Sequence, residues 1–189
     1  MDAAEALFLK HGFRRVAIDE VCRTAGVSRK TFYVYFENKD ALTIELLDKI
    51  IGSLTLEFVQ MMDSPTSFAS KMARMMEMKL ALSRRLSMEF LADLFNASSE
   101  KVSQFFHKKT AENIAIARSI FTQAQERGEI RSELNIDFVM AIFNNQADLC
   151  EKQEFRALFK DSESMMKQLA ELLLYGILGN NKSMDLIKD

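Results

Sequence analysis

Glycine and proline are scarce in this chain, with six glycines and one proline among 189 residues. A β-rich fold needs a turn about every 8–12 residues, and glycine and proline form many of those turns. Fifteen phenylalanines and twelve methionines supply large apolar side chains of adaptable shape, suited to helix packing. The sequence therefore predicts an all-α protein.

Other protein classes are excluded by the same sequence. The longest apolar runs cover a few residues, far short of the roughly 18 that a membrane-spanning helix needs. The start of the chain lacks the basic stretch and apolar block of a secretory signal. Two cysteines, Cys22 and Cys150, make neither a disulfide framework nor a metal-binding set, which is typical of a reducing cytoplasm. We expect a cytoplasmic protein with no membrane contact, no metal and no cofactor.

Capping residues and helix stops divide the chain into about nine expected helices. Ser28 and Asn38 are typical N-caps, and Gly12 and Gly26 are typical stops. Ser64-Pro65 places a cap before proline at a first helical position, which opens the fifth helix. The expected helices cover residues 2–10, 18–25, 29–36, 39–62, 65–81, 83–95, 98–127, 135–153 and 162–178.

The second and third expected helices are joined by a short turn of the helix-turn-helix kind. In that turn Gly26 supplies left-handed backbone, Val27 fills the core between the helices, and Ser28 caps the third helix. The third helix opens with Arg29 and Lys30, and a recognition helix contacts base edges with its N-terminal end. Outside this context the same basic pair would equally well be a solvated helix end.

Charge is distributed unevenly along the chain. Residues 10–39 hold seven basic and three acidic side chains, a net charge of +4. The whole chain carries −2, so the remainder carries −6. A basic module on an acidic body is expected when one end of a protein faces phosphate.

The N-terminal residues closely resemble the DNA-binding domain of TetR-family transcriptional regulators. The resemblance rests on Gly12-Phe13, on the segment from Ile18 to Phe36 with its Ala-Gly-Val-Ser turn, and on Asn38-Lys39-Asp40-Ala41-Leu42. It implies an N-terminal helix-turn-helix DNA-binding domain over residues 1–42 and a larger helical effector-binding and dimerisation domain over residues 43–189.

The resemblance also implies which residues contact DNA. Bases would be read from the major-groove side of the recognition helix, and phosphates would be held at its end and at the start of the fourth helix, where free N–H groups favour anions. Phe32 and Phe36 are expected in the core. The candidate DNA-binding residues are Ser28, Arg29, Lys30, Thr31, Tyr33, Val34, Tyr35 and Lys39.

Three residues depart from the family pattern. Ala17 stands where relatives often carry Thr or Ser, so the second helix lacks an N-cap hydroxyl, at a typical cost of about 1 kcal/mol. Asp19 would repel phosphate unless it accepts a hydrogen bond from a cytosine or pairs with an arginine. Val34 replaces a frequent His and suits a thymine methyl group.

The last expected helix is apolar almost all round and must be buried from several sides. The resemblance implies a four-helix dimer interface from residues 135–153 and 162–178 of two subunits, and packing within one subunit is the alternative. Two recognition helices would then reach major grooves about 34–36 Å apart on a pseudo-palindromic site. The candidate interface residues are Met140, Ala147, Met166, Leu169, Leu173 and Ile177.

The middle helices concentrate soft apolar side chains. Flexible thioethers can line an irregular cavity, although each of them could also simply fill the core. The resemblance implies an effector pocket among these helices, and we hypothesise a hydrophobic or amphipathic effector. The candidate pocket residues are Met61, Met62, Met75, Met76, Phe90, Phe106, Thr110, Asn113, Phe121, Phe143, Gln146 and Cys150.

The resemblance thus implies a homodimeric, ligand-responsive repressor released from double-stranded DNA by a hydrophobic small molecule. An enzyme is disfavoured, because neither His11 nor His107 stands in a nucleophile or metal-ligand pattern and no phosphate-binding loop is present. The remaining alternative is a helical interaction protein of the same fold that has lost specific DNA binding, as Ala17 and Asp19 could suggest.

Overall fold

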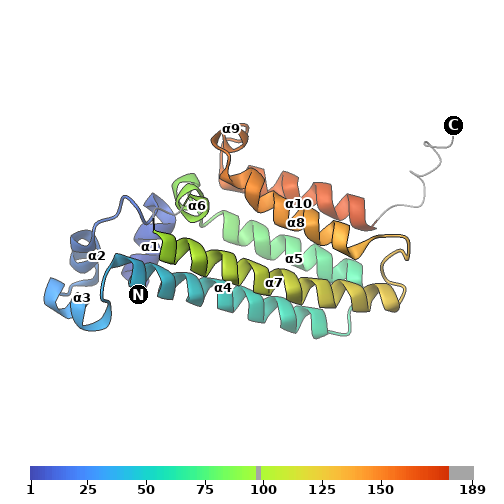
Figure 1. The fold of residues 1–189 in the computed structure, drawn as a ribbon, viewed down its shortest axis with the longest axis horizontal. Coiled ribbons are helices and arrows are strands. Elements are labelled where there is room, and N and C mark those ends of the chain that lie inside the picture. The colour runs from blue at the N-terminus through green and yellow to red at the C-terminus, as the bar shows by residue number, and fades with distance from the viewer. Residues whose placement is uncertain (97–98, 179–189) are drawn as a thin grey trace.

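The computed structural model describes residues 1–96 and 99–178, and these form ten helices and no strand. The predicted all-α fold class is confirmed. A small N-terminal group of helices lies at one end of an elongated bundle (Figure 1).

The N-terminal group consists of α1 (Asp2–His11), α2 (Ile18–Ala25) and α3 (Arg29–Tyr35). Gly26 ends α2 in the left-handed conformation, with φ 67° and ψ 29°, and Ser28 caps α3, as predicted. Ala17 precedes α2 in extended backbone and provides no side-chain cap, also as predicted.

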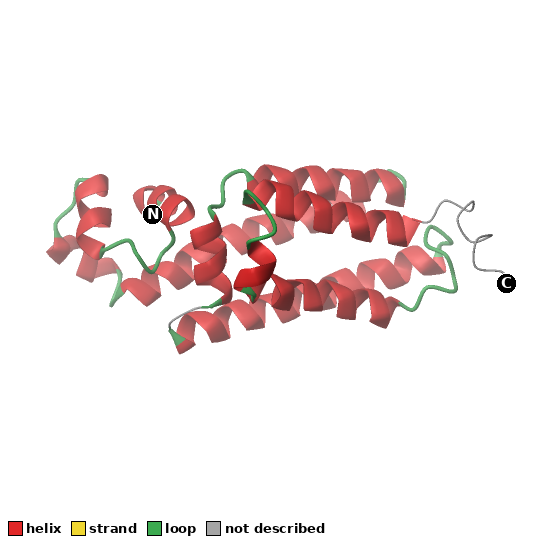
Figure 2. Ribbon diagram, turned by 90° about the horizontal axis from the view of Figure 1, so that it is seen from above, coloured by secondary structure: helices red, strands yellow, loops and turns green. Residues whose placement is uncertain are grey.

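The bundle consists of long helices that run along the length of the molecule. α4 packs against α7, α7 against α8, and α5 against α10 (Figures 1 and 2). The bounds are α4 (Lys39–Asp63), α5 (Phe68–Ser83), α6 (Met88–Phe95), α7 (Glu100–Glu126), α8 (Ile136–Glu151), α9 (Gln153–Arg156) and α10 (Ser162–Leu178).

Two predicted helix starts are wrong. α5 is capped by Ser67 rather than opened by Ser64-Pro65, because the Ser64 hydroxyl donates to the Met61 carbonyl at the end of α4. α6 is capped by Ser87 and not by Ser83, whose hydroxyl donates to Leu80 at the end of α5. The short helix α9 was not expected from the sequence.

The buried apolar side chains form separate clusters along the molecule. The first joins residues of α1 to α4 with Phe90 of α6 and Val102 of α7. A second fills the far half of the bundle around Met62 and Phe121, and a third lies around Met165 of α10. The predicted boundary at residues 42/43 falls inside the continuous helix α4 and inside the first cluster, so it remains a prediction.

Candidate nucleic-acid interface

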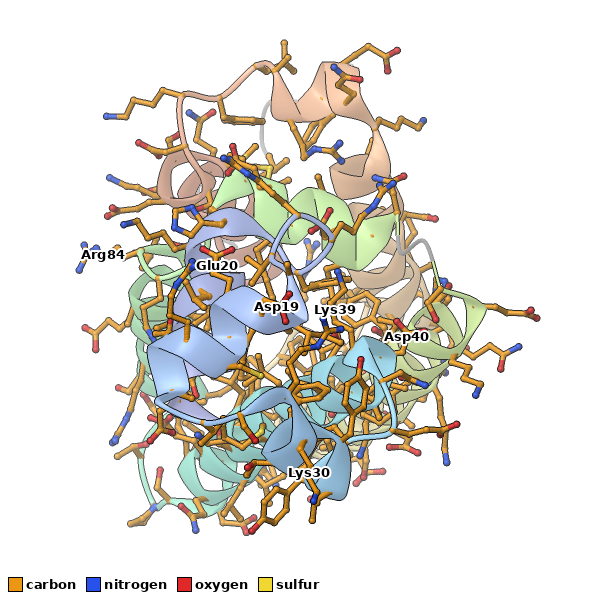
Figure 3. The ribbon with its side chains drawn as sticks, turned by 90° about the vertical axis from the view of Figure 1, so that its left-hand side faces the viewer. Asp19, Glu20, Lys30, Lys39, Asp40 and Arg84 are labelled. Atoms are coloured by element: carbon orange, nitrogen blue, oxygen red, sulfur yellow. The ribbon has the colours of Figure 1, made fainter. Side chains whose placement is uncertain are left out.

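Helix α3 lies at the end of the molecule that faces the viewer in Figure 3, and its polar side chains are exposed. The Ser28 hydroxyl accepts from the Thr31 N–H at 3.0 Å and lies 2.9 Å from the Thr31 hydroxyl. Both hydroxyls therefore use part of their hydrogen-bonding capacity within the first turn of α3. Arg29 and Lys30 are exposed, as direct contact with DNA requires.

Apolar and aromatic side chains divide α3 into an inner and an outer side. Phe32 is buried, and its ring lies 5.5 Å from that of the half-buried Phe36. Val34 and Tyr35 are 73% and 75% exposed, and Tyr33 is also exposed. Apart from Lys39, the candidate DNA residues are all exposed, and we call this set the recognition face: Ser28, Arg29, Lys30, Thr31, Tyr33, Val34 and Tyr35.

The role predicted for Val27 is wrong. Its side chain is 43% exposed and does not fill the space between α2 and α3. Val21 and Cys22 of α2 and Phe32 of α3 form that part of the core.

Asp19 pairs with Arg29, one of the arrangements that the sequence left open. The Arg29 Nε atom lies 3.2 Å from Asp19 Oδ1, and Arg29 Nη1 donates to Asp19 Oδ2 at 3.4 Å. Contact with the Tyr33 hydroxyl and the charge of Asp19 raise the pKa of the Arg29 guanidinium. The negative charge of Asp19 at this surface is therefore balanced by the positive charge of Arg29.

Lys39 has a structural role at the start of α4. Its ammonium group donates to the Arg14 carbonyl at 2.9 Å and to the Val16 carbonyl at 3.2 Å. It thereby ties the loop between α1 and α2 to α4. The contact of Lys39 with phosphate remains a prediction.

The N-terminal group of helices is attached to α6 by contacts that no sequence pattern indicated. The Ser87 N–H donates to the Leu9 carbonyl at 2.9 Å, and the Arg14 N–H donates to Asp93 Oδ2 at 2.8 Å. The Phe13 and Phe90 rings meet edge to face at 5.9 Å. These contacts join residues about 80 positions apart, which no local pattern can reveal.

Glu5 adds an ionic link across the same junction. Its carboxylate accepts from Lys49 of α4 at 3.0 Å and from Arg85, beyond the end of α5, at 2.5 Å. The hydrogen bond from Lys49 lowers the pKa of Glu5 most, burial opposes it, and Arg85 lowers the pKa further. Because the folded pKa lies below the unfolded one, this stabilisation is present near neutral pH and is lost on acidification.

We expect Glu5→Gln to lower the free energy of unfolding by about 1 kcal/mol at neutral pH. The difference from the unaltered protein should shrink as the pH falls below about 4.5, through the lower folded pKa of Glu5. Urea denaturation at several pH values measures both effects. Glu45→Gln, at an exposed position of α4, is the matched control and should show neither. A difference that persists unchanged at acid pH would contradict this account.

The predicted pocket residues are spread over more than one region. Met61, Met62, Met75 and Phe121 belong to the second cluster, whereas Phe90 lies in the first cluster at the junction with α1. Asn113 accepts from the Thr55 hydroxyl at 2.9 Å. Phe106 is half-buried with its ring 5.7 Å from that of Phe95, and Thr110 is half-buried. The side chains of Met76, Phe143, Gln146 and Cys150 lie outside the part that the structure describes.

A hollow of about 400 Å³ lies at the turn between α4 and α5, and of the predicted pocket residues only Met62 lines it. The other lining side chains are mostly polar. They include Lys71, which is buried and donates to the Met62 carbonyl at the end of α4. Among the described residues this hollow does not correspond to the apolar pocket predicted from the sequence.

The predicted dimer residues are only partly described. Met140 is 2% exposed and packs in the second cluster of its own subunit, which contradicts its predicted place in an interface. Leu169 is half-buried and packs against the third cluster. The side chains of Ala147, Met166, Leu173 and Ile177 lie outside the described part.

Comparison with known proteins relates the N-terminal helices to a protein family. The family model described as bacterial regulatory proteins, tetR family, matches residues 1–46, which hold α1, α2, α3 and the start of α4. Residues 1–46 therefore match the N-terminal region of the TetR family. The predicted resemblance to this family is thereby confirmed, as is the predicted class, a DNA-binding transcriptional regulator.

Relatives of this chain include an uncharacterised HTH-type transcriptional regulator, YdgC, of Bacillus subtilis. It is 23% identical over 94% of this chain and 90% of its own length. EthR of Mycobacterium tuberculosis is 31% identical over 33% of this chain and 29% of its own.

Solved structures share the fold over almost the whole chain. The fatty acid degradation regulator FadR of Bacillus halodurans superposes with a TM-score of 0.71, at 20% identity over 93% of this chain and 92% of that one. FadR of Bacillus subtilis, solved in complex with stearoyl-CoA, gives 0.69, at 21% identity over 93% and 96%. The predicted two-part helical architecture matches theirs.

Two further features are absent from the residues that the structure describes. None of their helices is long and apolar enough to cross a membrane. They also contain no group of three or more His, Cys, Asp or Glu side chains placed to hold a metal ion.

Proposed function

We propose that this protein is a homodimeric repressor that binds a pseudo-palindromic DNA site through the recognition face and is released by a hydrophobic or amphipathic small molecule. The observation that carries the proposal is the outward position of Arg29 and Lys30 at the capped start of α3. A recognition helix contacts base edges with this end, and its flanking residues hold phosphates.

Exposed apolar side chains on the last long helices support a dimer. Phe138 and Leu149 of α8 and Leu172 of α10 are exposed although they are large and hydrophobic. Within one subunit α8 packs on α7 and α6, and α10 packs on α5, while these three side chains stay exposed and could meet a second copy. Burial of these side chains between two subunits would present two α3 helices to successive major grooves, about 34–36 Å apart.

The nature of the effector is inferred from the interior of the bundle and from the relatives. The second cluster combines four thioethers and two aromatic rings within one core, from Met61, Met62, Met72, Met140, Phe68 and Phe121. Methionine side chains repack around ligands of varied shape. A structural relative holds stearoyl-CoA, and a further relative from Bacillus subtilis is a fatty acid metabolism regulator. A long-chain acyl compound is therefore the first effector to test.

The DNA-binding part of the proposal is tested with a site selected from a pool of randomised duplexes. We expect affinity to fall steeply as salt rises, because phosphate contacts release counterions. Lys30→Ala should weaken binding to the selected site and should flatten the salt dependence by about one unit if Lys30 holds a phosphate. Fluorescence anisotropy at several salt concentrations measures both quantities.

Lys160→Ala is the matched control and should leave DNA binding unchanged, because Lys160 is an exposed lysine between α9 and α10, a segment that lies away from α3 (Figure 1). Failure to select any sequence, or binding that does not respond to salt, would favour a helical interaction protein that has lost DNA binding. In a second arm, stearoyl-CoA is added to the formed complex. Release supports an acyl effector, and continued binding rejects this effector while leaving the DNA-binding role in place.

A further inference from the structure

An acidic side chain stands within the surface that is proposed to face DNA. Asp19, in the first turn of α2, is 63% exposed, and its partner Arg29, the first residue of α3, is 61% exposed. Figure 3 looks onto this end of the molecule, with Asp19 near its centre and Lys30 toward its edge. A carboxylate in this position repels phosphate and so weakens DNA binding, which raises the question of what Asp19 contributes to recognition.

The geometry of the pair shows what Asp19 does to Arg29. Arg29 Nη1 donates to Asp19 Oδ2 at 3.4 Å, and Oδ1 lies within ion-pair distance of Nε, at 3.2 Å. A guanidinium is planar and carries donors on more than one edge. Asp19 contacts Nε and Nη1, and the Tyr33 hydroxyl also contacts the guanidinium, so these two partners orient the side chain. Because a guanidinium has five N–H donors, donors remain for a base.

A guanine presents two acceptors, O6 and N7, to the major groove, and two donors on one guanidinium edge match them. A free arginine loses side-chain freedom when it makes this contact, and ordering the side chain beforehand removes part of that cost.

We infer that Asp19 is a positioning residue that holds Arg29 in place to read a guanine in each half-site, so that Asp19 sets sequence specificity at the expense of overall affinity. This inference rests on the proposed function, because it concerns the bases that the recognition face reads. Asp19 acts through Arg29, and it is Arg29 that touches the base.

Two other roles for Asp19 make different predictions. If Asp19 accepted a hydrogen bond from a cytosine itself, its loss would relax the preference at that cytosine whether or not Arg29 were present. If Asp19 only stabilised the start of α2, its removal would lower the stability of the protein and leave base preference unchanged.

The test is a double-mutant cycle with Asp19→Ala, Arg29→Ala and the double variant, measured on the selected site and on copies with each half-site base pair replaced. Arg29→Ala should abolish preference at one guanine, a loss of about five- to one-hundred-and-fifty-fold. Asp19→Ala should reduce preference at the same guanine by about two- to tenfold, the cost of ordering one side chain. It should also strengthen binding to random-sequence DNA, because a negative charge is removed.

The decisive measurement is Asp19→Ala in the Arg29→Ala background, where it should change no base preference. Glu20→Ala removes the same charge from the same turn of α2, at a position that faces a different side of the helix, and should leave the guanine preference intact. Thermal denaturation of each variant separates a loss of specificity from a loss of folding.

The outcomes keep this inference separate from the proposed function. If the unaltered protein binds no sequence specifically, the proposed function fails. If it selects a site but Asp19→Ala keeps the full preference for guanine, or changes base preference without Arg29, this inference is overturned and the proposed function stands.

Discussion

Gly12→Ala should lower the free energy of unfolding by about 3 kcal/mol, and the melting temperature by about 6–12 °C. Gly12 ends α1 with φ 77° and ψ 151°, a backbone conformation that is essentially restricted to glycine. A Cβ atom built there would lie 2.5 Å from Asp93 Oδ2 and 3.3 Å from the Glu89 carbonyl carbon. The substitution therefore strains the backbone and pushes apart the junction between the N-terminal domain and α6. Calorimetry or urea denaturation measures the loss.

Two other glycines provide matched controls for this substitution. Gly26→Ala meets no neighbouring atom within 4 Å and carries only the cost of left-handed backbone, about 1–2 kcal/mol. Gly52→Ala lies within α4 in open space and should stabilise the protein by about 0.5–1 kcal/mol. Adding Asp93→Ala to Gly12→Ala should not restore full stability, because the backbone strain remains. If Gly12→Ala and Gly26→Ala lowered the free energy of unfolding equally, the close approach of Gly12 to α6 would be contradicted.

The helices of the N-terminal domain were predictable because their signals are local. The bounds of α2 follow from the Gly26 stop and from the spacing of its apolar residues, and the start of α3 follows from Ser28. The starts of α5 and α6 were not predictable, because several serines compete as caps within a few residues. The choice at α6 depends on distant partners: Ser162 donates to the Ser83 and Leu86 carbonyls, and the Ser87 N–H donates to Leu9. These bonds hold residues 84–87 outside a helix.

The same distinction applies to the candidate site. The exposed side chains of α3 could be predicted, because one short helix with a known inner side fixes which residues face outward. The pairing of Asp19 with Arg29 could be stated only as one of several options, since it depends on how α2 and α3 pack. The bonds from Lys39 to Arg14 and Val16, and from Arg14 to Asp93, bring together segments that no spacing rule connects.

Phe90→Ala should lower the free energy of unfolding by about 3–5 kcal/mol. Phe90 was predicted to line an effector pocket, yet it is 3% exposed and packs edge to face on Phe13 in the cluster that joins α6 to the N-terminal domain. Truncation of a side chain in a filled core removes its contacts and leaves a cavity. Truncation of a side chain that lines an open pocket removes far fewer contacts. Urea denaturation measures the difference.

Phe106→Ala is the comparison that separates the two interpretations, because the sequence assigned both rings to the same pocket. Because Phe106 is only half-buried, Phe106→Ala should lower the free energy of unfolding by about 2 kcal/mol less than Phe90→Ala does. A loss below about 1 kcal/mol at Phe90 would return it to the pocket hypothesis. If Phe90→Ala instead causes the expected loss of about 3–5 kcal/mol, the Phe13–Phe90 contact is a stabilising link between α6 and the DNA-binding end. A ligand in the bundle could then alter DNA affinity by moving α6, to the extent that it binds one position of α6 more tightly than another.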